Sequence, residues 1–189
     1  MAKTNKVKFN VKQSHYATFS TETSPANPYN TPVPINGTVS ISLEQQGELT
    51  PFYADGIVYY TSSTNGGYEG DLTIALIPDD FRVAVLGEKA DTNQVLVENA
   101  NAVNNPFAYG CRIDGNELPT FFWFYNCTAT RPSIEATTIE DTTEVNTDVL
   151  TLSIAPDDSG NVRSKFVGTA DEGIGKTWFD NVYIPNYGA

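Results

Sequence analysis

The stretch GYEGDLTIALIPDDFRVAVLG, residues 67–87, joins a strand pattern directly to a helix pattern. In its first half Leu72, Ile74 and Leu76 alternate with smaller or polar residues, the period of two that places side chains on one face of a strand. The proline that follows has no backbone N–H to donate to a sheet. The alternation therefore predicts a strand over residues 71–77 that stops at this proline.

The second half of the stretch carries the signals of a short amphipathic helix. Asp79 or Asp80 is expected to accept the free amide donors of the first turn, and Gly87 suits the left-handed position just beyond the last turn. The apolar residues follow the i, i+3 and i+4 spacing of one helix face: Phe81, Ala84 and Val85. Because so short a helix is marginal alone, residues 79–87 are predicted to form a helix packed across a β-sheet.

Elsewhere the chain alternates short apolar runs with polar turns, which predicts a mainly β protein. Strands are expected over residues 7–11, 15–20, 38–43, 56–61, 94–98, 107–113, 119–126, 149–155 and 162–169. Turns are expected at Gln13-Ser14, at Asp114-Gly115-Asn116 and over residues 157–160, the last pairing strand 149–155 with strand 162–169. The proline-rich segment 21–37 is expected to be an exposed loop.

The densest apolar run is FFWFY, residues 121–125. Five consecutive aromatic residues cannot alternate with polar ones, so both faces of their strand are expected to be covered, by the core or by a neighbouring subunit. Residues 178–184, near the end of the chain, are expected to lie on the sheet as a strand or short helix. With 189 residues, the chain is long enough for one core and is predicted to form a single domain.

The charge balance argues against a nucleic-acid-binding protein. Asp and Glu number 23 and Lys and Arg 11, a net charge of −12. Binding to DNA irrespective of sequence depends on Lys and Arg displacing counterions, so this chain is expected to repel phosphate groups. An acidic surface also keeps proteins soluble, and the two interpretations of the charge both stay open.

Few residues suit catalysis or metal binding. His15 is the only histidine and has no nucleophile motif beside it, so it is expected at a packed or interfacial strand position and not as a general base. Cys111 and Cys127 are expected to be buried reduced thiols in a protein made in a cytosol. No run approaches the ~20 apolar residues of a membrane span. We predict no catalytic residue, no cofactor, no metal ligand and no enzymatic activity.

Four blocks carry a resemblance to a known family: PFYADGIVYY at residues 51–60, GYEGDLTIALIPDDFR at 67–82, YNCTATRPSIEATT at 125–138 and WFDNVYIP at 178–185. They resemble the major tail protein, the tail tube subunit, of long-tailed bacteriophages of Gram-positive hosts. The similarity continues through most of the chain from about residue 7, in the order of the family. It implies a tail-tube β-sandwich over residues 1–189, with one short helix packed on it and with N-terminal and loop extensions, a fold shared with the tube subunit of type VI secretion.

The resemblance also implies a structural function. Six copies would form a ring, and rings would stack head to tail around a tape measure protein, with tail terminator and distal tail proteins at the ends. The tube would conduct double-stranded DNA from capsid to host without binding it specifically and without a membrane partner. The expected location is the virion tail, and the host cytoplasm during assembly.

The residues expected at subunit contacts gather around segment 61–70. There Asn65-Gly66-Gly67 predicts a tight turn, and Tyr68 is expected to protrude. Tyrosine combines a large contact area with a hydrogen-bonding tip, which suits partner surfaces. The candidates are Tyr53, Tyr59, Tyr60, Asn65, Gly66, Gly67 and Tyr68. Loops 61–70 and 21–34 are expected to stack the rings. The composition fits a carbohydrate-binding or adhesion sandwich equally well, so that alternative stays open.

Overall fold

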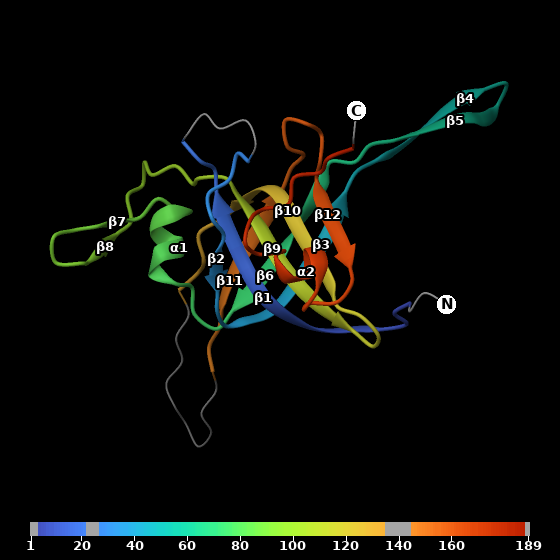
Figure 1. The fold of residues 1–189 in the computed structure, drawn as a ribbon. Helices are drawn as coiled ribbons and strands as arrows, with labels where there is room; N and C mark the ends of the chain where they lie inside the picture. The colour runs from blue at the N-terminus through green and yellow to red at the C-terminus, as the bar shows by residue number, and fades with distance from the viewer. Residues whose placement is uncertain (1–3, 22–26, 135–144, 188–189) are drawn as a thin grey trace, which may run out of the picture.

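The computed structural model describes residues 4–21, 27–134 and 145–187 and is mainly β, as expected (Figure 1). Most strands belong to one antiparallel sheet: β1 (Lys8–Thr18), β2 (Val33–Ile35), β3 (Thr38–Gln46), β6 (Gly67–Ile74), β9 (Phe107–Gly115), β10 (Thr120–Ala129), β11 (Asp148–Ile154) and β12 (Arg163–Val167). Their order is β2-β1-β9-β10-β11-β6-β3, and β12 also pairs with β10. Two separate hairpins are β4 (Leu49–Ala54) with β5 (Ile57–Ser63) and β7 (Lys89–Ala90) with β8 (Leu96–Val97). The helices are α1 (Asp79–Ala84) and α2 (Gly173–Lys176).

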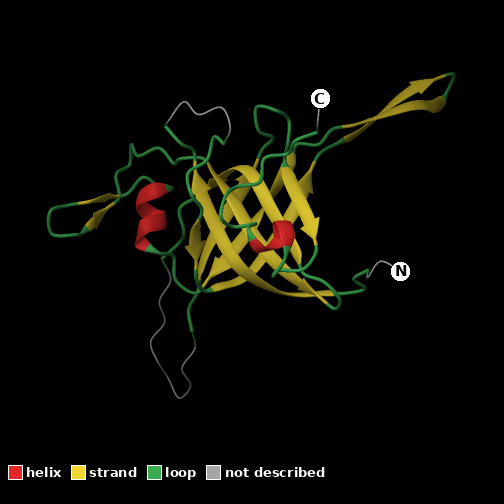
Figure 2. Cartoon of the chain, viewed as in Figure 1, coloured by secondary structure: helices red, strands yellow, loops and turns green. Residues whose placement is uncertain are grey.

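The sheet curls until β3 comes into contact with β1, which gives a sandwich-like body (Figure 2). Side chains from alternate positions meet on the concave side and form the main core. Fully buried members include Leu72, Ile74, Tyr109, Leu150 and Leu152. The alternation expected for residues 149–155 is therefore confirmed. The strand expected over residues 71–77 instead runs from Gly67 to Ile74, and the side chain of Leu76 is 73% exposed.

Helix α1 packs on the main core, as its apolar spacing predicted. Phe81 is fully buried and meets the rings of Tyr16 and Phe107 edge to face, with centroids 5.0 and 5.5 Å apart. Gly87 has a φ of +73°, the left-handed conformation expected after the helix. The predicted cap is wrong, because Pro78 occupies the N-cap position and, among the described residues, no side chain caps the helix. Both aspartates lie in the first turn, where their negative charge interacts favourably with the helix dipole and stabilises the helix.

A second core lies on the convex side of β10. Phe121, Trp123 and Tyr125 point to this side and are covered by the segment that follows α2. The indole N–H of Trp123 donates to the carbonyl of Trp178 at 3.0 Å, and the hydroxyl of Tyr125 donates to the carbonyl of Tyr183 at 2.6 Å. The convex face of the aromatic strand is thus covered within the chain, whereas Phe122 on the concave face is only partly buried. The covering segment is made of turns and irregular backbone instead of the expected strand or helix.

Two predicted strand connections are wrong. No turn separates residues 7–11 from 15–20, because β1 passes through Gln13-Ser14 with a register shift and a φ of +50° at Gln13. A bulge uses the same kinds of residue as a turn, so local sequence does not separate the two. β12 does not pair with β11. Both strands pair with β10, β11 along Cys127–Ala129 and β12 along Thr120–Phe124.

The proline-rich segment is only partly the exposed loop expected over residues 21–37. Residues 22–26 lie outside the described part of the chain. After them, Tyr29 and Ile35 are buried, and β2 pairs with β1. Proline is tolerated in a short edge strand, and β2 is such a strand, so Pro34 can lie opposite His15.

Candidate functional site

A hairpin of β4 and β5 projects away from the body of the protein (Figure 1). It continues the β3–β6 hairpin, because Thr64 N–H donates to the Glu48 carbonyl at 3.1 Å and Gly66 N–H donates to the Gln46 carbonyl at 2.7 Å. The chain reverses at Asp55 and Gly56, whose φ angles of +53° and +77° are those of the tight two-residue turn preferred in hairpins. We call residues 49–63 the arm.

The arm carries large apolar side chains that the rest of the described chain does not cover. Seven of them are between 51% and 72% exposed: Leu49, Phe52, Tyr53, Ile57, Val58, Tyr59 and Tyr60. The cross-strand neighbours Phe52 and Tyr60 lie on one face, and the next pair, Tyr53 and Val58, lies on the other. Both faces of the ribbon are therefore apolar and open to water. A two-stranded hairpin is marginal in water by itself, so a surface of this kind marks a contact with another molecule.

The structure divides the predicted contact residues between the arm and the sheet. Tyr53, Tyr59 and Tyr60 lie on the arm, and Asn65 and Gly66 lie at its base. Gly67 and Tyr68 belong to β6, contrary to the expected turn and protruding loop.

Tyr68 is half-buried beside the main core. Its ring meets that of Phe124 edge to face at 6.0 Å, and its hydroxyl accepts a hydrogen bond from Arg163 Nε at 3.0 Å. The tight turn expected at residues 65–67 is wrong, because Gly66 and Gly67 pair with Gln46 and the chain keeps its direction.

The true turn had a clear signal in the sequence. Asp55-Gly56 between two apolar runs is among the strongest short-range signals of a hairpin. The turn was missed because Gly56 was assigned to the expected strand over residues 56–61. Pro51 lies within β4, since proline is tolerated where its missing N–H faces solvent, as on either edge of a two-stranded arm.

A second surface is formed by the outward side chains of β3, β6 and β11. Glu44 and Glu69 are direct cross-strand neighbours, and Asp71 accepts a hydrogen bond from Thr151 Oγ1 at 2.9 Å. These strands contain no Lys or Arg, and serine and threonine fill most of the remaining outward positions. Like charges directly opposite each other destabilise a sheet, so folding alone does not favour this arrangement. We call this surface the acidic face.

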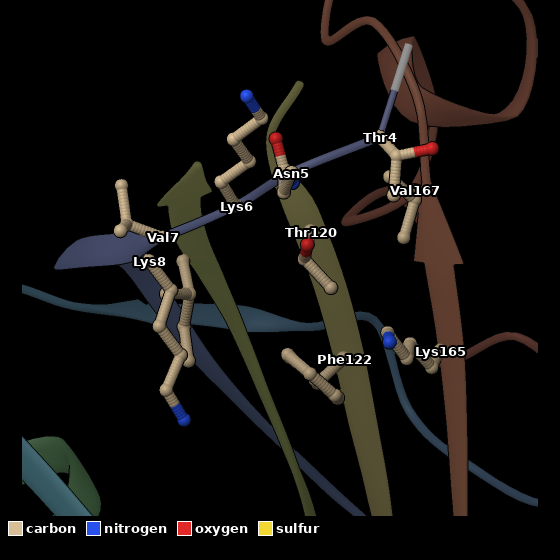
Figure 3. A pocket seen from close by; sticks show the side chains of 10 residues that line it. Thr4, Asn5, Lys6, Val7, Lys8, Thr120, Phe122, Lys165 and Val167 are labelled. Atoms are coloured by element: carbon tan, nitrogen blue, oxygen red, sulfur yellow. The ribbon is translucent and has the colours of Figure 1, made fainter. Parts of the chain in front are cut away.

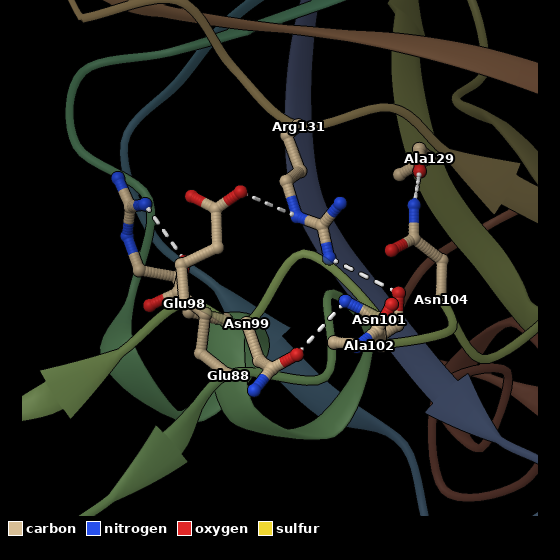
Figure 4. Close-up of polar contacts among 9 residues, drawn as sticks. Glu88, Glu98, Asn99, Asn101, Ala102, Asn104, Ala129 and Arg131 are labelled. Atoms are coloured by element: carbon tan, nitrogen blue, oxygen red, sulfur yellow. Dashed lines mark hydrogen bonds and ion pairs between the residues drawn. The ribbon is translucent and has the colours of Figure 1, made fainter.

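The β7–β8 hairpin projects on the other side of the body from the arm (Figure 1). Contacts between the loop that follows β8 and the segment that follows β10 fix the base of this hairpin (Figure 4). Arg131 pairs with Glu98 at 3.0 Å and donates to the Ala102 carbonyl at 3.2 Å, while Asn104 Nδ2 donates to the Ala129 carbonyl at 2.6 Å. The protein therefore presents two different projections on opposite sides.

The histidine and the cysteines occupy packed positions. His15 lies in β1, and its ring stacks on Phe179 with centroids 4.4 Å apart. Cys111 and Cys127 are free thiols in the main core. Burial raises the pKa of the Cys111 thiol to about 12, against a hydrogen bond from Tyr109 that lowers it, and raises the pKa of Cys127 well above its usual range. These thiols are therefore poor nucleophiles.

Within residues 4–21, 27–134 and 145–187, no group of three or more His, Cys, Asp or Glu side chains is arranged to hold a metal ion. In the same part of the chain, no helix has the length and apolar character needed to span a bilayer. A search with protein-family models and a search of curated protein sequences both find no match to this chain.

Proposed function

We propose that this protein is a structural subunit that assembles with copies of itself into rings stacked as a bacteriophage tail tube. The observation that carries the proposal is the arm, whose seven exposed apolar side chains have no partner surface within the described chain. Burial of apolar area is the main favourable term in protein association. A body with an arm on one side and a different projection on the other suits contacts between unlike surfaces, which generate rings and filaments.

The acidic face supports the same function. In the proposed tube it lines the lumen, where Glu44, Glu69 and Asp71 of every copy repel the phosphates of passing DNA. The ring is hexameric by the family resemblance, which also supplies the tape measure, tail terminator and distal tail proteins as partners. The virion tail is then the site of action, and the host cytoplasm is the site of assembly.

Negative-stain microscopy of purified protein across protein and salt concentration tests the proposal. Wild-type protein is expected to form rings or tubes at high concentration, and the double variant Phe52→Ser, Tyr60→Ser is expected to stay monomeric. Leu76→Ser is the matched control, because Leu76 is 73% exposed but lies outside the arm. A wild-type protein that remains monomeric at every concentration, and that binds glycans, would favour the carbohydrate-binding alternative.

The lumen assignment has its own test. Tubes of the triple variant Glu44→Lys, Glu69→Lys, Asp71→Lys should retain short duplex DNA at about 50 mM salt and release it near 200 mM, because lysine–phosphate contacts weaken steeply with salt. Wild-type tubes should retain none at either concentration. The measurement is co-sedimentation of fluorescent duplex with the tubes. If the triple variant forms tubes that do not retain DNA, the acidic face does not line the lumen.

A further inference from the structure

The concave side of the sheet is open at one end, where it forms a groove beside the main core. Two adjacent cavities of 560 and 270 Å³ make up this groove. They share Lys8, Ile113, Phe122 and Lys165, from β1, β9, β10 and β12. Figure 3 shows the larger cavity, with Lys8, Phe122 and Lys165 labelled. The smaller cavity extends to Ile41 and Leu43 on β3. The groove therefore lies between the two halves of the curled sheet.

The floor of the groove is apolar and incompletely covered. Ile113, Phe122, Ile41 and Leu43 pack against the main core but are only partly buried. These four side chains face the concave side of the sheet, but they lie beyond the part of the sheet where β1 and β3 are in contact. An apolar floor that is open to water is an unfilled contact surface.

The rim of the groove is positively charged, in contrast to the rest of an acidic protein. Lys6, Lys8, Arg163 and Lys165 line it, four of the 11 Lys and Arg residues of the chain. None of the four forms an ion pair with a carboxylate of the described residues. The Arg163 guanidinium lies 5.8 Å from the ring centroids of Tyr68 and Phe122, so one cation is fixed over the aromatic floor. The groove thus fits a partner that is apolar and acidic.

The arm has this chemistry. Residues 49–63 contain Asp55 at the tip and no Lys or Arg, and Glu48 precedes them. Both faces of the arm are apolar, and the arm of the same copy points away from the body (Figure 2). Resting on the proposed function, we infer that the groove receives the arm of a second copy, with the apolar arm side chains on the floor and the acidic residues against the cationic rim. One contact then covers both open surfaces.

The contact joins two different surfaces, the arm of one copy and the groove of the next. Each copy in such a contact still offers a free groove or a free arm to a further copy. Association of this type continues until a ring closes or a filament grows. The arm and the groove are then the two surfaces through which the proposed assembly extends.

Site-specific cross-linking tests the contact. Two single variants, Ile57→Cys on the arm and Lys165→Cys on the rim of the groove, are mixed and oxidised. Dimers are expected that require both variants and disappear on reduction. Native Cys111 and Cys127 are at most 1% exposed and should not react. Ser42→Cys on the acidic face replaces the groove variant as control. Equal dimer yield with Ser42→Cys, or no dimer with Lys165→Cys, would overturn the inference.

A charge exchange tests the same contact without added cysteines. Two variants reverse the charge on one side of the contact: the single variant Asp55→Lys on the arm, and the double variant Arg163→Glu, Lys165→Glu on the rim of the groove. Each should raise the protein concentration needed for assembly by roughly ten-fold or more, because it places like charges opposite each other. The triple variant combining them should recover most of the wild-type assembly. Assembly of all three variants at the wild-type concentration, or failure of the triple variant to recover, would contradict the contact.

The two proposals fail in different ways. Rings or tubes of wild-type protein without arm–groove cross-links would leave the tube function intact and remove this contact. Arm–groove cross-links in a protein that forms only dimers would support the contact and remove the tube. A strictly monomeric wild-type protein without cross-links would remove both.

Discussion

Gly67 stands where the arm joins the sheet, and the structure requires glycine there for two reasons. Its φ is +102°, and a Cβ at this position would collide with the carbonyl oxygen of Ile154 on β11. We expect Gly67→Ala to lower the free energy of unfolding by about 2–4 kcal/mol, measured by urea denaturation. Gly56→Ala is the matched control, with a φ of +77° and nothing near its Cβ, and it should cost about 1–2 kcal/mol or less. Equal costs would show that contact with β11 is unimportant.

The two cysteines offer a second test at the level of single residues. Both thiols are buried in the main core, and burial raises the pKa of Cys111 to about 12. Because the thiolate is the reactive form, we expect neither cysteine to react with a disulfide reagent such as DTNB at pH 8 in the native protein. Two thiols per chain should react in denaturant. Fast reaction of the native protein would show that the core opens readily or that these positions are exposed.

His15 should make stability depend on pH near neutrality. Burial lowers its pKa below the ordinary value of 6.5, and the Gln13 carbonyl, 2.8 Å from Nδ1, opposes this. The unfolded chain therefore takes up a proton near pH 6.5 that the folded chain takes up only at lower pH. The free energy of unfolding should fall as the pH drops from about 7 to 5. His15→Phe, which retains the ring stacked on Phe179, should reduce this fall in urea titrations. An unchanged slope would assign the pH dependence to other groups.

At the scale of elements, α1 depends on one side chain. Phe81 is fully buried and contacts Tyr16 and Phe107, whereas Val83 on the same helix is 41% exposed. Phe81→Ala should lower the free energy of unfolding by about 3–5 kcal/mol because it leaves a cavity in the main core. Val83→Ala should cost less than about 1 kcal/mol. Similar costs in urea denaturation would mean that the helix is not held by its buried face.

The same scale shows what the sequence could and could not predict. The α1 helix, the β9–β10 hairpin and the inward face of β11 follow from local periodicity and turn residues, and they were predicted. The pairing of β12 with β10 was not, because it depends on two strands sharing one edge of β10. The projecting hairpin was also missed, although Tyr59 and Tyr60 were expected at subunit contacts, because only residues 56–61 were expected to form a strand. Whether apolar side chains are buried depends on what lies opposite them in space.

At the scale of the whole molecule, folding and assembly should be separable. The arm contributes no residue to either core, so the double variant Phe52→Ser, Tyr60→Ser should melt within about 2 °C of a dilute, monomeric wild-type sample. Its light scattering at high concentration should stay at the monomer value. The measurements are differential scanning calorimetry and static light scattering. A large drop in melting temperature would mean that the arm stabilises the body of the same copy.

The continuity of the arm with the β3–β6 hairpin also limits how related chains can vary. One residue added to each strand between the sheet and Asp55-Gly56 would move the tip outward by about 3.3 Å and turn every later side chain to the opposite side. Two added residues per strand would restore the original orientation and lengthen the ribbon by about 6.6 Å. The length of the arm can therefore evolve only by two residues per strand at a time. The spacing between neighbouring copies that are joined by the arm would change in the same steps.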